Sequence, residues 1–312
     1  MSANKAKRDL LSLQDLTSEE VLYLFELTEF LKKDKNQQTH HIQGHSVGLL
    51  FQKPSNRTRV SFEVGIAQLG GNCIYLGPEE INLGKRESVP DVAKTLSRYL
   101  SAIVARTNTH KDLIELGKQA AVPVINGLSD LFHPCQALAD LFSIKEKFGK
   151  LQGLTLGFIG DGNNVSHSLL LGCAKVGMNM KMATPKNYEP DPEIFKIAQG
   201  LAKETGAKLT VTKTPEEAAK GADVIYADVW VSMGQEKEEK KRLEDFNGYQ
   251  INKELVKHAN KDYIFMHCLP AHRGQEVTED VIDNDRSIIF DQAENRMHVQ
   301  KAVLVFLLNK RS

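Results

Sequence analysis

Short apolar runs alternate with longer amphipathic stretches along this chain. After an N-terminal helical stretch, apolar runs predict strands at Val47–Phe51, Cys73–Leu76, Ala102–Ala105 and Val122–Ile125. The amphipathic segment Pro134–Phe148 predicts a helix, and strand-like runs resume at Thr155–Ile159, Lys181–Thr184, Lys208–Val211, Val224–Ala227, Tyr263–Met266 and Ser287–Phe290. This βα alternation predicts an α/β fold with parallel sheets.

The length of the chain favours two domains. Its 312 residues slightly exceed the size at which a single hydrophobic core stops growing. The pattern restarts near Leu151, and Ala293–Leu308 has the apolar spacing of a helix that returns to the first domain. We therefore expect two Rossmann-like domains, each a parallel β-sheet flanked by helices: residues 1–150 with the C-terminal helix 292–312, and residues 151–291.

Composition excludes several classes of protein. Lys plus Arg and Asp plus Glu each total 40, which speaks against an extended nucleic-acid surface and is compatible with a local basic pocket. The four cysteines are widely spaced, which speaks against a disulfide framework or a structural zinc site. The N-terminal segment lacks the apolar core of a signal peptide, and no apolar run is long enough to span a bilayer. The sequence therefore predicts a cytoplasmic protein without membrane association. The charge cluster Lys237–Arg242 is typical of a solvated surface.

Polar clusters follow the predicted strands, where parallel sheets bind ligands. The first cluster, Ser55-Asn-Arg-Thr-Arg59, lies between a strand and a helix that ends at Gly70-Gly71. Hydroxyls, guanidiniums and the positive end of the helix dipole favour a phosphate there. The alternative is a capped helix with solvated arginines. Arg106 after the third run is either a surface residue or a second phosphate ligand.

Two further clusters leave alternatives open. Gly160-Asp-Gly-Asn-Asn-Val165 lacks the third glycine of a dinucleotide fingerprint, and no acidic residue ends the next strand, so a nicotinamide cofactor is not expected. Asn163 or Asn164 then either caps a helix or presents an amide to a carboxylate. His133, before the helix started by Pro134, is either structural or a neutral donor that polarises a carbonyl.

The last two clusters carry an anion and a thiol. Asp228-Val-Trp-Val-Ser-Met-Gly234 offers a carboxylate that either caps a neighbouring helix or binds an ammonium group. In His267-Cys-Leu-Pro270, adjacent strand residues point to opposite faces. His267 is therefore poorly placed to activate Cys268, and an unreactive ligand-contacting thiol is favoured over a nucleophile.

Taken together, these motifs resemble the ornithine carbamoyltransferases nearly end to end. The resemblance rests on Phe51–Glu63, His133-Pro-Cys-Gln136, Gly160–Asn164, Asp228–Gly234, His267–Pro270 and Asp291-Gln-Ala-Glu-Asn-Arg296. It implies a transferase of arginine metabolism, in biosynthesis or catabolism, that moves the carbamoyl group of carbamoyl phosphate to the δ-amine of L-ornithine. It also implies a homotrimer and no metal or organic cofactor. Residues 1–150 with 292–312 would then bind carbamoyl phosphate, and residues 151–291 would bind ornithine.

Family roles map onto matching positions of this sequence. The resemblance implies that Thr58, Arg106 and His133 polarise the carbamoyl oxygen as catalytic residues. The residues implied to bind carbamoyl phosphate are Ser55, Asn56, Arg57, Thr58, Asn82, Arg106, His133, Pro134, Cys135, Gln136, Cys268, Leu269 and Arg296. Those implied to bind ornithine are Asn164, Asp228, Ser232 and Met233.

Two positions depart from the family pattern, and rival functions remain. Asn56 stands where the family usually has Thr, and Asn82 stands where it has a Gln that reaches carbamoyl phosphate from a neighbouring subunit. The shorter Asn82 side chain puts that contact in doubt. The rivals are a carbamoyltransferase for aspartate, putrescine or an N-acylated ornithine, and a non-catalytic binding protein with the same fold.

Overall fold

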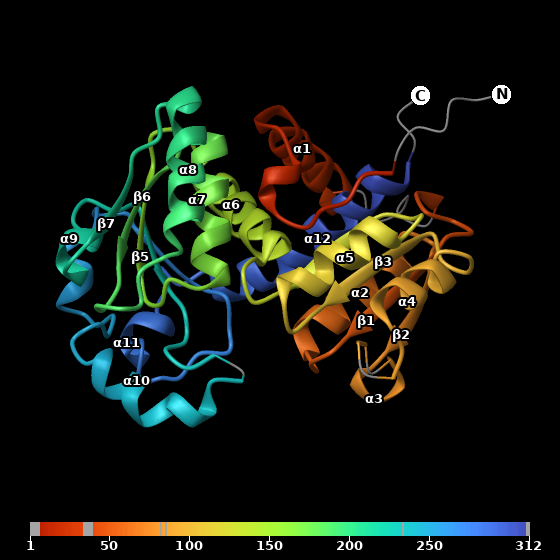
Figure 1. Cartoon of the computed structure of the whole chain (residues 1–312). Coiled ribbons are helices and arrows are strands. Elements are labelled where there is room, and N and C mark those ends of the chain that lie inside the picture. The colour runs from red at the N-terminus through yellow and green to blue at the C-terminus, as the bar shows by residue number, and fades with distance from the viewer. Residues whose placement is uncertain (1–6, 34–39, 82, 85, 233, 310–312) are drawn as a thin grey trace. The chain divides into compact units, whose positions relative to one another are not determined.

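The computed structural model describes residues 7–33, 40–81, 83–84, 86–232 and 234–309. These residues form two compact units (Figure 1), Met1–Leu138 with Arg296–Ser312 and Ala139–Asn295. The chain passes from one unit to the other within α6 (Pro134–Phe148) and again within α12 (Ile289–Leu308). The C-terminal helix therefore returns to the first unit, as the sequence predicted.

The first unit is built on a parallel sheet with the strand order β2-β1-β3-β4. Its four strands are β1 (Ser46–Phe51), β2 (Asn72–Leu76), β3 (Ala102–Arg106) and β4 (Val124–Leu128). Its other elements, besides its parts of α6 and α12, are η1 (Leu13–Asp15), α1 (Ser18–Lys33), α2 (Asn56–Gln68), α3 (Pro78–Ile81), α4 (Val89–Leu96) and α5 (His110–Gln119). The chain moves to one side of β1 for β2 and to the other side for β3, so the order reverses between β1 and β3.

The second unit has a five-stranded parallel sheet with the order β7-β6-β5-β8-β9. Its strands are β5 (Thr155–Ile159), β6 (Asn179–Ala183), β7 (Leu209–Thr212), β8 (Val224–Ala227) and β9 (Ile264–His267). Its other elements are α7 (Asn164–Val176), α8 (Pro192–Thr205), α9 (Pro215–Ala219), η3 (Glu236–Glu238), α10 (Glu239–Asp245), η4 (Leu255–His258) and α11 (Glu279–Ile282). Here the order reverses between β5 and β8.

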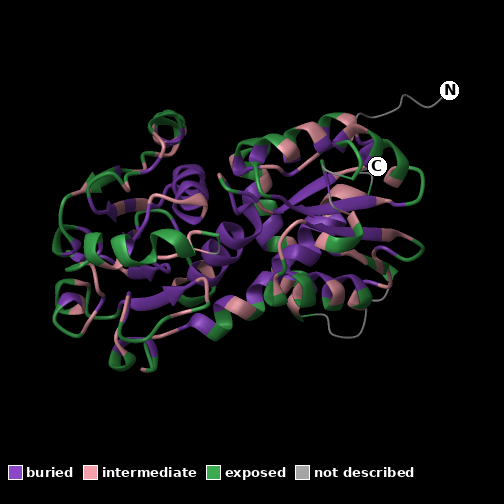
Figure 2. Cartoon of the chain, turned by 60° about the horizontal axis from the view of Figure 1, so that its bottom comes forward, coloured by how far each residue is buried: buried purple, intermediate pink, exposed green. Residues whose placement is uncertain are grey.

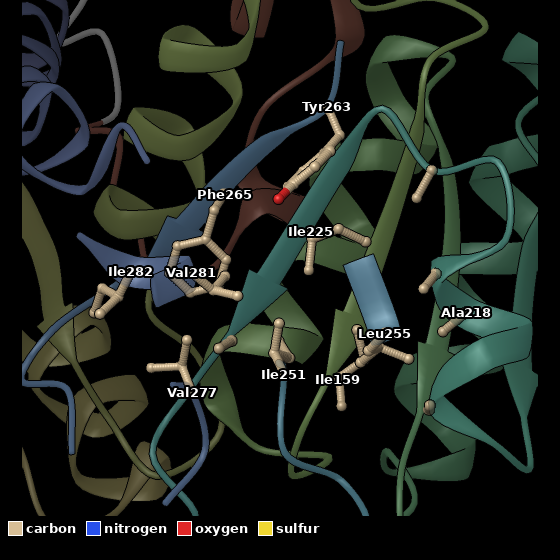
Figure 3. Close-up of a cluster of buried hydrophobic side chains, with 14 of the residues drawn as sticks. Ile159, Ala218, Ile225, Ile251, Leu255, Tyr263, Phe265, Val277, Val281 and Ile282 are labelled. Carbon is tan, nitrogen blue, oxygen red and sulfur yellow. The ribbon is translucent and has the colours of Figure 1, made fainter. Parts of the chain in front are cut away.

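Apolar strand residues explain the stability of both sheets. Most strand residues are buried in Figure 2; several helices expose one face, whereas α7 is buried over almost its whole length. In the second unit, Ile159, Ile225 and Phe265 from three strands pack with Val281 and Ile282 of α11 (Figure 3). Strands buried on both faces read as continuous apolar runs, which is why the sequence pattern located them.

Two predicted strands need correction. Ser287–Phe290 is not a strand: Ser287 makes one isolated bridge to Phe265, and α12 begins at Ile289. β4 begins at Val124 rather than Val122, because Pro123 has no N–H for a ladder and contributes only its carbonyl, which accepts from Ile103 N–H at 2.9 Å. An apolar run alone does not distinguish a strand from the start of a buried helix.

Candidate active site

The first turn of α2 follows directly from the end of β1. Ser55 is the N-cap residue, and its Oγ accepts a hydrogen bond from Thr58 N–H at 3.4 Å. The Ser55 hydroxyl also lies 3.0 Å from Thr58 Oγ1. The helix is therefore capped, yet capping does not exclude an anion, because the positive end of the dipole and the exposed Asn56 and Arg57 remain at the same turn.

Arg296 connects this turn to two other helices of the first unit. From α12, its Nη2 donates to Thr58 Oγ1 and its Nη1 donates to Gln136 Oε1 at 2.9 Å. All three side chains are buried. A guanidinium offers donors in a fixed fork, so Arg296 holds the Thr58 hydroxyl and the Gln136 amide in one defined arrangement.

Arg106 is the last residue of β3, and it is buried, with an exposed fraction of 7%. Its Nε makes no hydrogen bond with the residues that the structure describes. Burial, together with the positive charges of Arg296 and Arg57, lowers the Arg106 pKa to about 10. A buried cation with an unsatisfied donor beside two other cations favours a bound anion.

His133 immediately precedes α6, and its carbonyl oxygen accepts hydrogen bonds from the N–H groups of Gln136 and Ala137. Burial lowers the pKa of His133 well below 6.5, and the charges of Arg296, Arg106 and Arg57 lower it further. The imidazole is therefore neutral at physiological pH. A neutral imidazole beside cations can donate a hydrogen bond to a carbonyl oxygen without adding a further positive charge.

Asn126 in β4 fixes the loop that carries His133, a role that the sequence pattern did not indicate. Its Nδ2 donates to Leu11 O at 2.8 Å and to Phe132 O at 3.2 Å. Its carbonyl oxygen lies 3.8 Å from the thiol of Cys135, whose pKa burial raises to about 12. The predicted strand ended at Ile125, one residue before Asn126, so the sequence pattern did not mark this residue.

In the second unit, Asp228 follows β8 and is almost wholly buried. Its Oδ1 accepts from Val229 N–H at 2.8 Å and from the Cys268 thiol at 2.9 Å. Its Oδ2 accepts from Asn163 Nδ2 at 2.6 Å. These bonds fix the carboxylate at the end of β8 without a neighbouring cation among the contacts described.

The turn between β5 and α7 supplies the Asn163 partner. Asn163 is the N-cap residue of α7, and its Oδ1 accepts from Val165 and Ser166 N–H. Asn164 is the first residue of the helix. Gly162 is required here because a Cβ at this position would lie 2.4 Å from Pro190 N. Of the two asparagines considered, Asn163 is the cap, and Asn164 is half-buried beside it.

Arg242 corrects the prediction of a solvated charge cluster. It lies in α10 but is buried, and its Nη1 donates to Asp161 Oδ2 at 2.7 Å and to Trp230 O at 2.9 Å. It therefore ties the segment after β8 to the turn after β5. Ser232, further along that segment, donates its N–H to Gln235 Oε1 at 3.0 Å.

The predicted site residues thus fall into two groups. The first unit contains Ser55, Asn56, Arg57, Thr58, Arg106, His133, Pro134, Cys135, Gln136 and Arg296. The second unit contains Asn164, Asp228, Ser232, Cys268 and Leu269. Asn82 and Met233 lie outside the described residues. In each unit, the strand order reverses between two neighbouring strands. Residues at or after the ends of these two strands belong to that unit's group of site residues.

The described residues include neither a candidate metal cluster nor a candidate membrane-spanning helix. Within this part of the chain, no three or more His, Cys, Asp or Glu side chains are grouped so that they could hold a metal ion. Among the same residues, none of the helices has both the length and the apolar character needed to cross a bilayer.

Comparison with known protein families matches both halves of the chain. Residues 8–146 match the aspartate/ornithine carbamoyltransferase carbamoyl-P binding domain, and residues 152–307 match the Asp/Orn binding domain of the same family. The chain belongs to the aspartate/ornithine carbamoyltransferase family.

Individual relatives are similar over almost the whole chain. An ornithine carbamoyltransferase from Thermococcus kodakarensis is 53% identical over 310 residues, which cover 99% of this chain and 98% of the relative. A Pyrococcus furiosus relative named "Ornithine carbamoyltransferase, anabolic" is 51% identical over 99% of this chain and 98% of its own length. The solved ornithine carbamoyltransferase structure from Pyrococcus furiosus superposes with a TM-score of 0.94, covering 97% of each chain. The resemblance inferred from the motifs is therefore confirmed.

Proposed function

We propose that this protein is an ornithine carbamoyltransferase, which converts carbamoyl phosphate and L-ornithine into L-citrulline and phosphate. Family membership and full-length relatives of that name support the activity. The anabolic name of one relative supports a role in arginine biosynthesis. The choice of acceptor rests on one observation: Asp228 presents a fixed, buried carboxylate in the unit matched to the Asp/Orn binding domain.

Carbamoyl phosphate would bind at the guanidiniums of the first unit. The first turn of α2 and Arg57 and Arg106 would hold the phosphate. Thr58, Arg106 and neutral His133 would donate hydrogen bonds to the carbamoyl oxygen, and Gln136 and Arg296 would hold the amide end. Asn56 and Pro134 would contribute through the main chain, and so would Cys135, because its thiol is directed at Asn126 O. Loss of one oxyanion donor raises a barrier by about 3 kcal/mol.

Ornithine would be held by the second unit. Asp228 would pair with its α-ammonium group, Asn164 would meet its α-carboxylate, and Ser232 and Met233 would cover it. Main-chain groups of Cys268 and Leu269 would reach the carbamoyl end. Aspartate as acceptor would require a cation for its second carboxylate, whereas the fixed group is an anion. Putrescine lacks both α-substituents, which would leave Asn164 and Asp228 unmatched.

The reaction itself needs a neutral amine. The δ-ammonium group, with a pKa of about 10 as in lysine, cannot attack a carbonyl until it loses a proton to solvent. The guanidiniums of the first unit would disfavour a further positive charge and would stabilise the growing oxyanion. The nitrogen–carbon bond then forms, the carbon–oxygen bond to phosphate breaks, and the departing phosphate takes the amine's second proton. This scheme needs no side-chain base and no cofactor.

The test compares four acceptors with carbamoyl phosphate under identical conditions: ornithine, putrescine, aspartate and N-acetylornithine. We expect ornithine to give the highest kcat/KM, because a site built to bind polar groups rejects analogues that lack them by about 10⁴-fold. Equal or better turnover of putrescine would overturn the acceptor assignment. Absence of turnover with all four would favour the non-catalytic binding protein.

We further propose that the protein works as a homotrimer in the cytoplasm. Val60 and Val64 are exposed one turn apart on α2, and β2 is an open edge of its sheet. A second copy would cover such a surface. The four cysteines are all free thiols, the usual state in a reducing compartment. Sedimentation should give three times the 34.8 kDa chain mass, and Val64→Asp should lower it. A wild-type monomer would contradict the trimer.

A further inference from the structure

His267, the last residue of β9, has both ring nitrogens engaged inside the second unit. Its Nδ1 accepts a hydrogen bond from Leu269 N–H at 2.9 Å, and its Nε2 lies 3.2 Å from Glu276 Oε1. Both side chains are essentially wholly buried, with 0% and 1% exposure. Because Nδ1 faces a donor, the ring proton is on Nε2 and is donated to the carboxylate.

Leu269 has an unusual backbone that this bond supports. Its φ is 59°, in the left-handed region that residues with a Cβ rarely adopt. Such a conformation persists only when surrounding contacts hold it. The Nδ1 of His267 is the acceptor for the N–H of this residue, so the ring contributes directly to the conformation of the segment that follows β9.

Glu276 and Gln292 hold His267 from two further directions. Glu276 Oε1 also accepts from His272 N–H, and the Glu276 carbonyl accepts from Ile251 N–H at 2.9 Å, so the carboxylate is anchored independently of the ring. The N–H of His267 donates to Gln292 Oε1 at 3.0 Å. Gln292 Nε2 in turn donates to the buried Asp140 at 2.7 Å. The ring therefore sits in a rigid frame.

We propose that His267, oriented by Glu276, is a positioning residue of the reaction. It holds the main chain of Cys268 and Leu269, which keeps the Cys268 thiol at its 2.9 Å contact with Asp228 and presents Leu269 in one orientation. The inference rests on the proposed function, in which these two residues contact the carbamoyl end. A misplacement of about 1 Å at such a position lowers the rate by about 10²-fold.

Two substitutions distinguish the contributions of the two ring nitrogens of His267. In His267→Asn, the amide oxygen takes the place of Nδ1 and keeps an acceptor for Leu269 N–H. In His267→Gln, the longer amide takes the place of Nε2 and keeps the bond to Glu276 but not the acceptor. Both remove the ring from the same buried position, so both should lower the thermal unfolding temperature to a similar extent.

With carbamoyl phosphate and ornithine, we expect His267→Gln to lose about 10²-fold in kcat and His267→Asn to stay within about tenfold of wild type. Equal losses in the two variants would overturn the proposal and assign His267 a purely structural role. A wild-type protein without citrulline production would instead refute the proposed function.

A second measurement does not depend on activity. Cys268 is half-buried and held on Asp228, so its alkylation by iodoacetamide, followed by peptide mass spectrometry, reports how firmly this segment is fixed. We expect alkylation at Cys268 to be several-fold faster in His267→Gln than in wild type and near the wild-type rate in His267→Asn. Unchanged rates in both variants would show that His267 does not hold this main chain.

Discussion

The thiol of Cys268 donates to Oδ1 of Asp228 across 2.9 Å, and both residues directly follow buried parallel strands. β8 and β9 are neighbours, with Ala227 paired to His267, so the next residue of each strand is brought to the same edge of the sheet. With Asn163 on Oδ2, the carboxylate is held by two side chains, from the segments after β5 and β9, and by the N–H of Val229. The thiol serves as a donor to this carboxylate. That Cys268 is an unreactive substrate contact and not a nucleophile stays a prediction.

Substitution of Asp228 tests the acceptor half of the proposed function. Asp228→Asn removes the charge and places an NH₂ group against one of the existing donors. We expect the KM for ornithine to rise by about 10- to 100-fold, since a hydrogen bond to a charged group contributes about 1.5–3 kcal/mol. Affinity for carbamoyl phosphate, measured by calorimetry, should stay near the wild-type value.

Cys268→Ser is the matched control for Asp228→Asn. The hydroxyl keeps a donor for Asp228 at nearly the same position, so the ornithine KM should change less than in Asp228→Asn. Loss of carbamoyl phosphate affinity in Asp228→Asn would show that the residue acts on the other substrate.

Arg57 and Arg59 provide a matched pair for the phosphate site. The positive charge of Arg57 helps to lower the pKa values of Arg106 and His133. Arg59 pairs with Glu63 at 2.8 Å, and its guanidinium lies over the Tyr75 ring at 3.7 Å. We expect Arg57→Ala to raise the KM for carbamoyl phosphate by about 10- to 100-fold, through loss of a charge-assisted hydrogen bond, and Arg59→Ala to change it much less.

Steady-state kinetics of both arginine variants, with sedimentation to verify that assembly is unchanged, makes this comparison. Unchanged citrulline production by Arg57→Ala would refute the phosphate role of the Ser55–Thr58 turn. An equal loss in Arg59→Ala would indicate a general effect on α2 instead of a specific contact.

The neutral state of His133 predicts a pH dependence of stability. Its pKa lies well below 6.5 in the folded chain, through burial and three guanidiniums, and near 6.5 in the unfolded chain. Below about pH 6.5 the unfolded chain therefore binds a proton that the folded chain does not. The free energy of unfolding should fall with decreasing pH by up to about 1.4 kcal/mol per pH unit from this residue.

Urea unfolding of wild type and His133→Gln at pH 5 and pH 7 isolates that contribution. We expect the wild type to lose more stability than the variant between these two values. Turnover of His133→Gln should fall by about 10²-fold if His133 polarises the carbamoyl oxygen. Equal pH slopes for the two proteins would contradict the depressed pKa.

Local sequence patterns predicted most of the fold because buried parallel strands are continuous apolar runs between turn residues. The same regularity located Ser55, Arg106 and Asp228 at strand ends. The strand expected at Ser287–Phe290 was wrong, because α12 begins within this run at Ile289; Ile288 and Ile289 are buried, whereas Phe290 is exposed. Local composition does not specify which neighbour an apolar run will meet.

Buried polar contacts were the part that the sequence did not predict. Arg242 looked like one of several solvated charges, but its partner Asp161 lies 81 residues away and the pair is buried. Glu276, which bonds the ring of His267, stands in a segment without any motif, and Gln292 stands in the Asp291–Arg296 motif, which did not indicate its bond to His267. Such partners depend on how distant segments pack, so residue type and spacing along the chain contain little information about them.

Lys301 provides a prediction that is independent of catalysis. It lies in α12, is wholly buried, and donates from Nζ to Gln68 Oε1 at 2.9 Å. Burial lowers its pKa to about 8, whereas the unfolded chain keeps a value near 10.5. Between these two values the unfolded chain binds more protons, so this lysine makes the protein more stable as the pH rises from about 8 towards 10.5.

The substitution Lys301→Met tests whether the buried lysine makes stability rise with pH. Methionine has a similar length and no charge to desolvate, and the half-buried Gln68 can turn to water. We expect the variant to be more stable than wild type by about 1 kcal/mol at pH 7, as found when buried charges are replaced by apolar residues of similar volume. The difference should shrink by pH 9.5, because the wild-type amine is then neutral in the folded chain and the free-energy cost of its deprotonation falls as the pH approaches 10.5. A variant that is strongly destabilised at pH 7, or a difference that does not change with pH, would show that the lysine stays charged and stabilises α12 through its bond to Gln68.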